Sequence, residues 1–214
     1  ANYNGPVPVV GYTVSDGSLT ASSTLTIVIN PVVDGFTDAD EQVSTPEDTP
    51  LTGTLLADTT SVDGPVTVTG FTIEGISESF TAGQTAGIPG VGSLLINPDG
   101  TYSFTPAANF NGPVPVVTYR LTDGSSTDTS TLTITVTAVN DPPVGNADTV
   151  TTPEDTVLTL PVASLLANDT DVDGDTLTLL SVQDAVNGTV ALQNGNVVFT
   201  PAPNFNGPAR FTYT

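Results

Sequence analysis

Thr131-Leu132-Thr133-Ile134-Thr135-Val136 is the stretch that decides the fold of this 214-residue chain. Its apolar residues alternate with threonine, so one face of the segment is apolar and the other is polar. A period of two residues is typical of a half-buried β-strand. The stretch Thr24-Leu25-Thr26-Ile27-Val28-Ile29 has the same pattern, and β-branched threonine favours strands over helices.

The same alternation recurs along the chain, at residues 66–73, 102–105, 114–121, 177–182, 189–192 and 197–200. Turn signals separate these segments: Asp99-Gly100, Asp123-Gly124, Asn187-Gly188 and Asn194-Gly195. Helical spacing is absent except for one short turn around Ser164–Asn168. About seven short strands per hundred residues predict an all-β chain of tandem immunoglobulin- or cadherin-like β-sandwich domains.

Internal repetition sets the domain organisation. The motif Asn2-Tyr3-Asn4-Gly5-Pro6 recurs at 109–113 and 204–208, and Thr45-Pro46-Glu47-Asp48-Thr49 recurs at 152–156. Both motifs shift by 107 residues, from 2 to 109 and from 45 to 152. We therefore expect 1–33 to be the C-terminal part of a first repeat, 34–140 a complete repeat, and 141–214 the N-terminal part of a third, taken from a longer array.

The composition excludes several kinds of chemistry. The chain has 23 acidic and two basic residues, a net charge of −21, and no His or Cys. Because it also lacks Lys, it has no imidazole base, thiol nucleophile or Schiff-base amine, and no ligand set for zinc, haem or iron–sulfur clusters. An anionic surface repels phosphate, so we expect no nucleic-acid partner, and the apolar runs are too short for membrane insertion.

The most acidic loop is Asp169-Thr170-Asp171-Val172-Asp173-Gly174-Asp175. It places carboxylates at alternate positions and a glycine where the loop must turn, and Ca²⁺ prefers such oxygen ligands. The loop is not an EF-hand, because the twelfth position is Leu180 rather than Glu. The matching loop at residues 59–65 keeps only Asp63 of these carboxylates, so we expect it to bind calcium weakly or not at all.

A second acidic set lies where one repeat becomes the next. Its members are Asn140, Asp141, Glu154, Asp155 and Asp123, with Asp16, Asp34, Glu47 and Asp48 as counterparts in other repeats. If the ends of the sandwiches abut, these carboxylates would repel one another unless a cation lay between them. We therefore expect interdomain Ca²⁺, with neighbouring repeats of the same chain as partners. The alternative is that these groups only form turns, a linker and a solvated loop.

These motifs resemble the cadherin-like tandem repeats of giant bacterial surface proteins, including RTX-type adhesins. The resemblance rests on Pro153–Thr156, Leu165–Asp175, Phe199–Gly207, Tyr119–Gly124 and Val139–Pro143. It implies an extracellular, cell-surface extender that calcium rigidifies and that holds a distal ligand-binding domain away from the cell, in adhesion and biofilm formation.

The resemblance also implies roles for individual residues. Asn140 and Asp141 match the linker, Glu154 and Asp155 match the early acidic motif, and Asp169, Asp171, Asp173 and Asp175 match the metal loop. The complete repeat departs from this pattern at Val33, before Asp34, and at Thr59, Ser61 and Pro65.

Three other interpretations of the sequence compete with a calcium-dependent extender. A carbohydrate- or surface-binding module is the main alternative, although aromatic residues make up only 6% of the chain and Trp is absent. An enzyme is not expected, because the paired carboxylates recur with the repeat and sit at turns. Strand exchange between copies is also conceivable, since residues 1–30 carry strands that 141–214 lack. The insert at 76–93 is expected to be a longer loop or hairpin.

Overall fold

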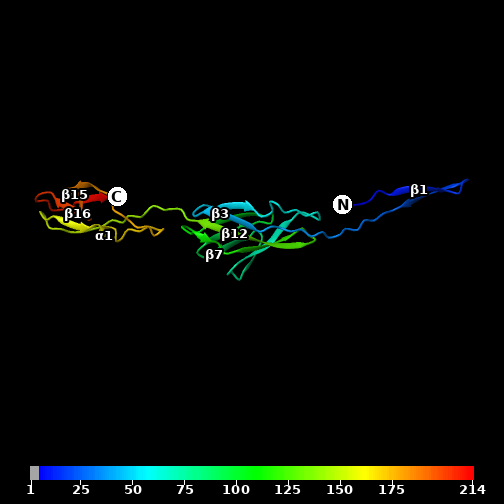
Figure 1. Ribbon diagram of the computed structural model, residues 1–214, viewed down its shortest axis with the longest axis horizontal. Coiled ribbons are helices and arrows are strands. Elements are labelled where there is room, and N and C mark those ends of the chain that lie inside the picture. Colours follow the sequence, from blue (N-terminus) through cyan, green and yellow to red (C-terminus); the bar gives the residue numbers. More distant parts are fainter. Residues whose placement is uncertain (1–4) are drawn as a thin grey trace. The chain divides into compact units, whose positions relative to one another are not determined.

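The computed structural model describes residues 5–214 (Figure 1). The first three residues of the motif copy at 2–6, Tyr3 among them, lie outside the described residues. The chain divides into two compact units, Ala1–Ala138 and Val139–Thr214. Strands dominate both units, which confirms the all-β prediction.

The N-terminal strands form a two-stranded hairpin. Strand β1 (Val10–Ser15) pairs antiparallel with β2 (Thr20–Leu25). The predicted strand through Ile29 is wrong beyond Leu25, because within the described residues no other segment pairs with residues 26–29. Consequently the apolar face of this segment is exposed.

Residues 34–138 form the expected β-sandwich. One sheet has the order β10-β12-β11-β5-β6, with β3 parallel to β12, and the other has the order β4-β9-β8-β7. The first sheet contains β3 (Glu41–Pro46), β5 (Thr67–Ile73), β6 (Ser79–Thr81), β10 (Gly112–Pro113), β11 (Val117–Thr122) and β12 (Thr127–Thr137). The second contains β4 (Leu51–Thr54), β7 (Thr85–Ile88), β8 (Gly92–Ile96) and β9 (Thr101–Pro106). The insert at 76–93 thus supplies β6, β7 and the first two residues of β8.

The core of this sandwich lies between the two sheets. Leu132, Ile134 and Val136 on β12 are buried, as the alternation predicts. They share one apolar cluster with residues of the opposite sheet, such as Phe104. Tyr119 on β11 is also fully buried, so its hydroxyl must find polar partners inside the domain.

Residues 139–214 form a smaller all-β unit. Strand β16 (Asn196–Pro201) pairs with β13 (Leu158–Pro161) and β15 (Gly188–Gln193), while β14 (Val182–Val186) pairs with β17 (Arg210–Tyr213). The predicted helical turn is α1 (Val162–Leu165). The buried hydrophobic side chains of this unit are Leu165, Val197 and Phe199.

The predicted strand at 177–182 is largely wrong. Only its end is a strand, because β14 begins at Val182. The backbone N–H groups of Leu180 and Ser181 donate to the Thr214 carbonyl. The pairing with β17 therefore reaches back to Leu180 and no further, and residues 177–179 have no strand partner.

Candidate functional site

The acidic loop at 169–175 lies against the segment that begins the second unit. The Asp141 N–H donates to Asp173 Oδ2 at 2.7 Å, and the Asn146 N–H donates to Asp169 Oδ1 at 2.7 Å. Between them, Val144 and Thr170 form an antiparallel bridge. The structure therefore brings Asp141 together with the predicted metal loop, although 32 residues separate Asp141 from Asp173.

The loop itself is organised by Asp171. Its Oδ1 accepts hydrogen bonds from the backbone N–H groups of Asp173, at 3.0 Å, and Asp175, at 3.2 Å. Gly174 has a φ of +79°, a conformation that favours glycine. The alternate carboxylates thus line a tight turn, as the sequence pattern predicts.

The complete repeat reproduces part of this arrangement. The Asp34 N–H donates to Asp63 Oδ2 at 2.7 Å, the counterpart of the Asp141–Asp173 bond. Ser61 occupies the place of an acidic loop residue, and its Oγ donates to Asp123 Oδ2 at 2.5 Å. Neutral hydroxyls therefore replace carboxylates around this loop, in line with the weaker calcium binding expected here.

Asp123 and Asp16 hold the Asp-Gly turns of their hairpins. Asp123 is buried, and its Oδ1 accepts the N–H groups of Ser125 and Ser126 at 2.8 and 2.7 Å. The hydrogen bond from Ser61, followed by that from the Ser126 backbone, lowers the pKa of Asp123 far below its usual range. The exposed Asp16 repeats the turn, and the Leu19 N–H lowers its pKa.

The Pro-Glu-Asp-Thr motif pairs with the Asn-Phe-Asn-Gly motif in both units. Asp48 Oδ1 accepts the Asn109 N–H at 3.0 Å, and Asp155 Oδ1 accepts the Asn204 N–H at 2.8 Å. The buried Glu47 accepts a hydrogen bond from the side-chain amide of Asn111 at 3.3 Å. The two motifs that repetition revealed are thus bonded to each other.

The predicted ligands of the complete repeat therefore fall into two groups. Asp34 lies before β3 and is bonded to Asp63, and Ser61 joins the same loop to Asp123, while Glu47 and Asp48 follow the end of β3. A six-residue strand spans about 20 Å, so one ion cannot bind both groups. In the second unit Asp155 likewise accepts a hydrogen bond from the Asn204 N–H, and no bond to the 169–175 loop is found for it among the described residues.

The donor chemistry of the loop region fits calcium, because every candidate ligand offers hard oxygen. Within residues 5–214, however, no three acidic side chains lie close enough together to enclose an ion. Asp141 and Asp173 are already adjacent through the backbone bond.

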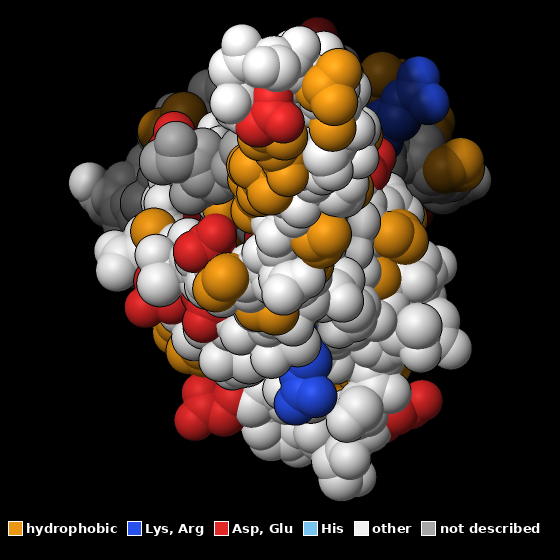
Figure 2. Space-filling model, turned by 90° about the vertical axis from the view of Figure 1, so that its right-hand side faces the viewer, with side chains coloured by type: hydrophobic (Ala, Val, Ile, Leu, Met, Phe, Trp, Pro, Cys, Tyr) orange, Lys and Arg blue, Asp and Glu red, His pale blue; other side chains and the backbone are white. Residues whose placement is uncertain are grey.

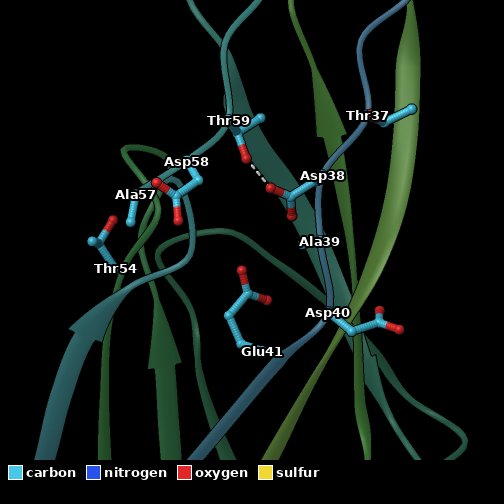
Figure 3. Close-up of a pocket in the computed structure, with 9 residues that line it drawn as sticks. All are labelled: Thr37, Asp38, Ala39, Asp40, Glu41, Thr54, Ala57, Asp58 and Thr59. Carbon is cyan, nitrogen blue, oxygen red and sulfur yellow. Dashed lines mark hydrogen bonds between the residues drawn. The ribbon is translucent and has the colours of Figure 1, made fainter.

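A pocket that sequence reasoning missed lies at the start of β3. It has a volume of about 330 Å³, and Asp38, Glu41 and Asp58 point into it, whereas Asp40 points away (Figure 3). The Thr131 N–H donates to Asp40 Oδ1 at 2.8 Å, which holds Asp40 against β12. The acidic run Asp38-Ala39-Asp40-Glu41 was the sequence signal for this pocket. Tyr119, which bonds to Glu41 there, lies 78 residues further along the chain.

The sequence comparisons agree with this architecture. Residues 34–138 match the family of bacterial cadherin-like domains, and residues 139–214 match the family of cadherin-like domains. The chain belongs to the cadherin-like family. Cadherin-like domains are extracellular adhesion domains, typically without catalytic activity. A search of curated proteins gave no match.

Several solved structures resemble this cadherin-like chain weakly. The protocadherin GammaB4 extracellular domain is 16% identical over 94% of this chain and 36% of that chain, with a TM-score of 0.36. An endo-fucoidan hydrolase of glycoside hydrolase family 107 is 16% identical over 95% and 33%, with a TM-score of 0.34. The N-terminal four Ig domains of Dscam1 are 12% identical over 96% and 59%, with a TM-score of 0.33. The chain thus spans less than two thirds of each, and such likeness carries no functional argument.

The surface of the cadherin-like chain is acidic and partly apolar. Acidic side chains outnumber basic ones on the face in Figure 2, where hydrophobic side chains are also exposed. Within the described residues, no helix is long and apolar enough to cross a membrane.

Proposed function

We propose that this chain is an extender segment of a bacterial cell-surface adhesin, in which calcium rigidifies tandem cadherin-like domains that project a distal ligand-binding domain. The observation that carries the proposal is the bond between the Asp141 N–H and Asp173 Oδ2. It gathers the start of a domain and its acidic loop into one oxygen-rich site, where an ion would fasten the two segments together.

The charge of the chain supports this function. A net charge of −21 destabilises compact domains by self-repulsion, and a divalent cation reduces that repulsion. An ion that binds only the folded state also stabilises it by mass action. Extracellular calcium modules bind in the ~10⁻⁴–10⁻³ M range. Such a chain would therefore be most rigid outside the cell.

Calcium between neighbouring repeats is part of the proposal. Domains joined by short linkers move relative to one another unless their interface is large, and an ion bound by both would restrict that motion. Asn140 and Asp141 follow the domain boundary directly in the sequence, and the Glu47 N–H donates to the carbonyl of Thr137, just before that boundary; these oxygen-bearing residues are the support for it. We propose no catalytic role, because the predicted ligands accept backbone hydrogen bonds that order loops.

Calorimetry on metal-stripped chain tests the calcium site. We expect calcium chloride to release or absorb heat with saturation, and the double variant Asp171→Asn, Asp173→Asn to lose most of the signal. These changes keep the acceptor oxygens of the loop but remove two of its four negative charges. Asp99→Asn, in the turn at Asp99-Gly100, is the matched control and should bind as the wild type does. No heat on calcium addition would refute the proposal.

Small-angle scattering tests the rigidity. We expect the maximum dimension and its spread to change when EDTA removes calcium. An unchanged scattering curve would refute calcium rigidification even if the ion binds. A glycan array on the same chain tests the carbohydrate-binding alternative, and specific glycan binding would favour it over an extender.

A further inference from the structure

The hydroxyl of Tyr119 lies between two carboxylates. The residue is fully buried on β11, and its Oη is 2.6 Å from Asp38 Oδ2. The same Oη is within hydrogen-bond distance of Glu41 Oε2. A phenol has one hydrogen, so it can donate to only one of the two carboxylates.

Asp38 is the better acceptor of that hydrogen. Thr59 Oγ1 donates to its other oxygen, and the Ser130 side chain also donates to Asp38. Each of these three donors favours the charged form of Asp38, against burial, which disfavours it. Glu41 Oε2 then faces the lone pairs of the Tyr119 oxygen, and this contact is attractive only if Glu41 carries a proton and donates it.

The surrounding charges also favour a protonated Glu41. Asp58 points into the same pocket, and Asp128 on β12 accepts the Asp38 N–H at 2.8 Å. Asp40 adjoins Glu41 in the chain, and the Tyr102 phenol faces it from β9. Arg120 is exposed on the opposite side of β11 from Tyr119. No positive charge among these groups offsets the carboxylates.

The pKa shifts of these three groups also favour protonated forms. Burial raises the pKa of Glu41, against the hydrogen bond from Tyr119, which lowers it. Burial likewise raises the pKa of Asp38. Burial, followed by the hydrogen bond to Asp38, raises the pKa of Tyr119 far above its usual range, so the phenol keeps its proton.

We propose that Asp38, Tyr119 and Glu41 form a proton-dependent latch that fastens the start of β3 to β11. In the closed state Glu41 donates to Tyr119 Oη, and Tyr119 donates to Asp38. When the pH rises, Glu41 releases its proton to solvent and two anions then repel each other across one hydroxyl. Because the folded-state pKa of Glu41 is raised, the latch is complete below the ordinary carboxyl range and is lost as the pH rises through the raised value.

The second unit has a related but different arrangement. The Tyr213 hydroxyl donates to Asp148 Oδ2 at 3.0 Å. Gly145 stands at the position that matches Asp38, 107 residues later, and Asp169 supplies the second carboxylate. Since Asp169 belongs to the candidate calcium loop, we place the latch only in residues 34–138, where it is independent of the proposed calcium site.

Carboxyl-carbon NMR on the full chain in EDTA tests the latch directly. Selective labelling of glutamate gives five signals, and Glu41→Gln identifies the one from Glu41. We expect the Glu41 signal to titrate at a higher pH than the ordinary glutamate value of ~4.3, because burial raises its pKa. A Glu41 midpoint at or below that value would overturn the proposal.

Hydrogen exchange on amides 38–45 tests the effect on β3. The glutamine amide in Glu41→Gln imitates the protonated acid, so amide exchange at pH 7.5 should be slower in this variant than in the wild type. The expected difference is up to about tenfold for each unit by which the pKa of Glu41 is raised. At pH 4.5 the two should match, and the control Glu78→Gln should match the wild type at both pH values. Faster exchange in Glu41→Gln at both pH values would overturn the latch. The latch would also be overturned if calcium slowed amide exchange in the wild type and lowering the pH did not.

Discussion

Leu132 and Leu25 hold the same position in two copies of one sequence pattern, yet the structure places them differently. Leu132 is 0% exposed in the sandwich core, whereas Leu25 is 50% exposed on the hairpin. Replacing each with alanine removes the same atoms from two environments. The pair therefore separates the contribution of the sequence pattern from the contribution of burial.

The expected effects differ several-fold. Truncation of a fully buried leucine costs about 2–5 kcal/mol, because the transfer free energy is lost and a cavity remains. At about 4–8 °C per kcal/mol for a domain of this size, Leu132→Ala should lower the Tm of the sandwich by roughly 10 °C or more. Full burial of leucine is worth about 1.5–3 kcal/mol, so half burial without a cavity limits Leu25→Ala to about 1 kcal/mol.

Differential scanning calorimetry of the full chain, in EDTA and with calcium, measures both variants. A second pair, Ile134→Ala and Ile27→Ala, repeats the comparison with exposures of 0% and 44%. If Leu25→Ala destabilised the chain as much as Leu132→Ala, the hairpin side chains would be buried in solution. That result would refute the inference that burial, rather than the pattern, sets the energy.

Three further outcomes are expected. Asp48→Ala should cost about 1 kcal/mol in denaturant unfolding by removing the acceptor for the Asn109 N–H, whereas Asp48→Asn should restore most of it. Because the pKa of Asp123 is lowered, its carboxylate stabilises the turn at pH values above the ordinary Asp pKa of ~3.9, and this stabilisation is lost as the pH falls through the lowered pKa. Amides 124–126 should therefore lose protection against hydrogen exchange in acid. The protection of the same amides in Asp123→Asn should depend less on pH. We also propose strand exchange between copies, for which sizing at high concentration should show a dimer that Leu25→Asp dissociates; a strictly monomeric wild type would exclude it.

Much of the fold could be predicted because its signals are local. The alternation in Thr131–Val136 and the turn at Asp123-Gly124 need only a few neighbouring residues, and both are confirmed. The 107-residue repetition placed the complete repeat at 34–140, close to the matched region at 34–138. The contact between Asp141 and the 169–175 loop was not predicted, because the sequence pattern assigned Asp141 to the interdomain set with Asp123, Glu154 and Asp155. Calcium at either set remains a proposal.

The sequence by itself determined the strand pattern, the repeats and the acidic, metal-compatible chemistry. Only the tertiary structure decided which copy of a pattern is buried, that Asp48 holds Asn109, and that Asp38 and Glu41 meet Tyr119 about 80 residues away. The physical reason is that periodicity reports which face of a strand is apolar, whereas burial and hydrogen bonding depend on partners that distant segments supply. Residues 26–29 and 177–179 have the strand pattern but find no partner strand among residues 5–214, so they are not strands.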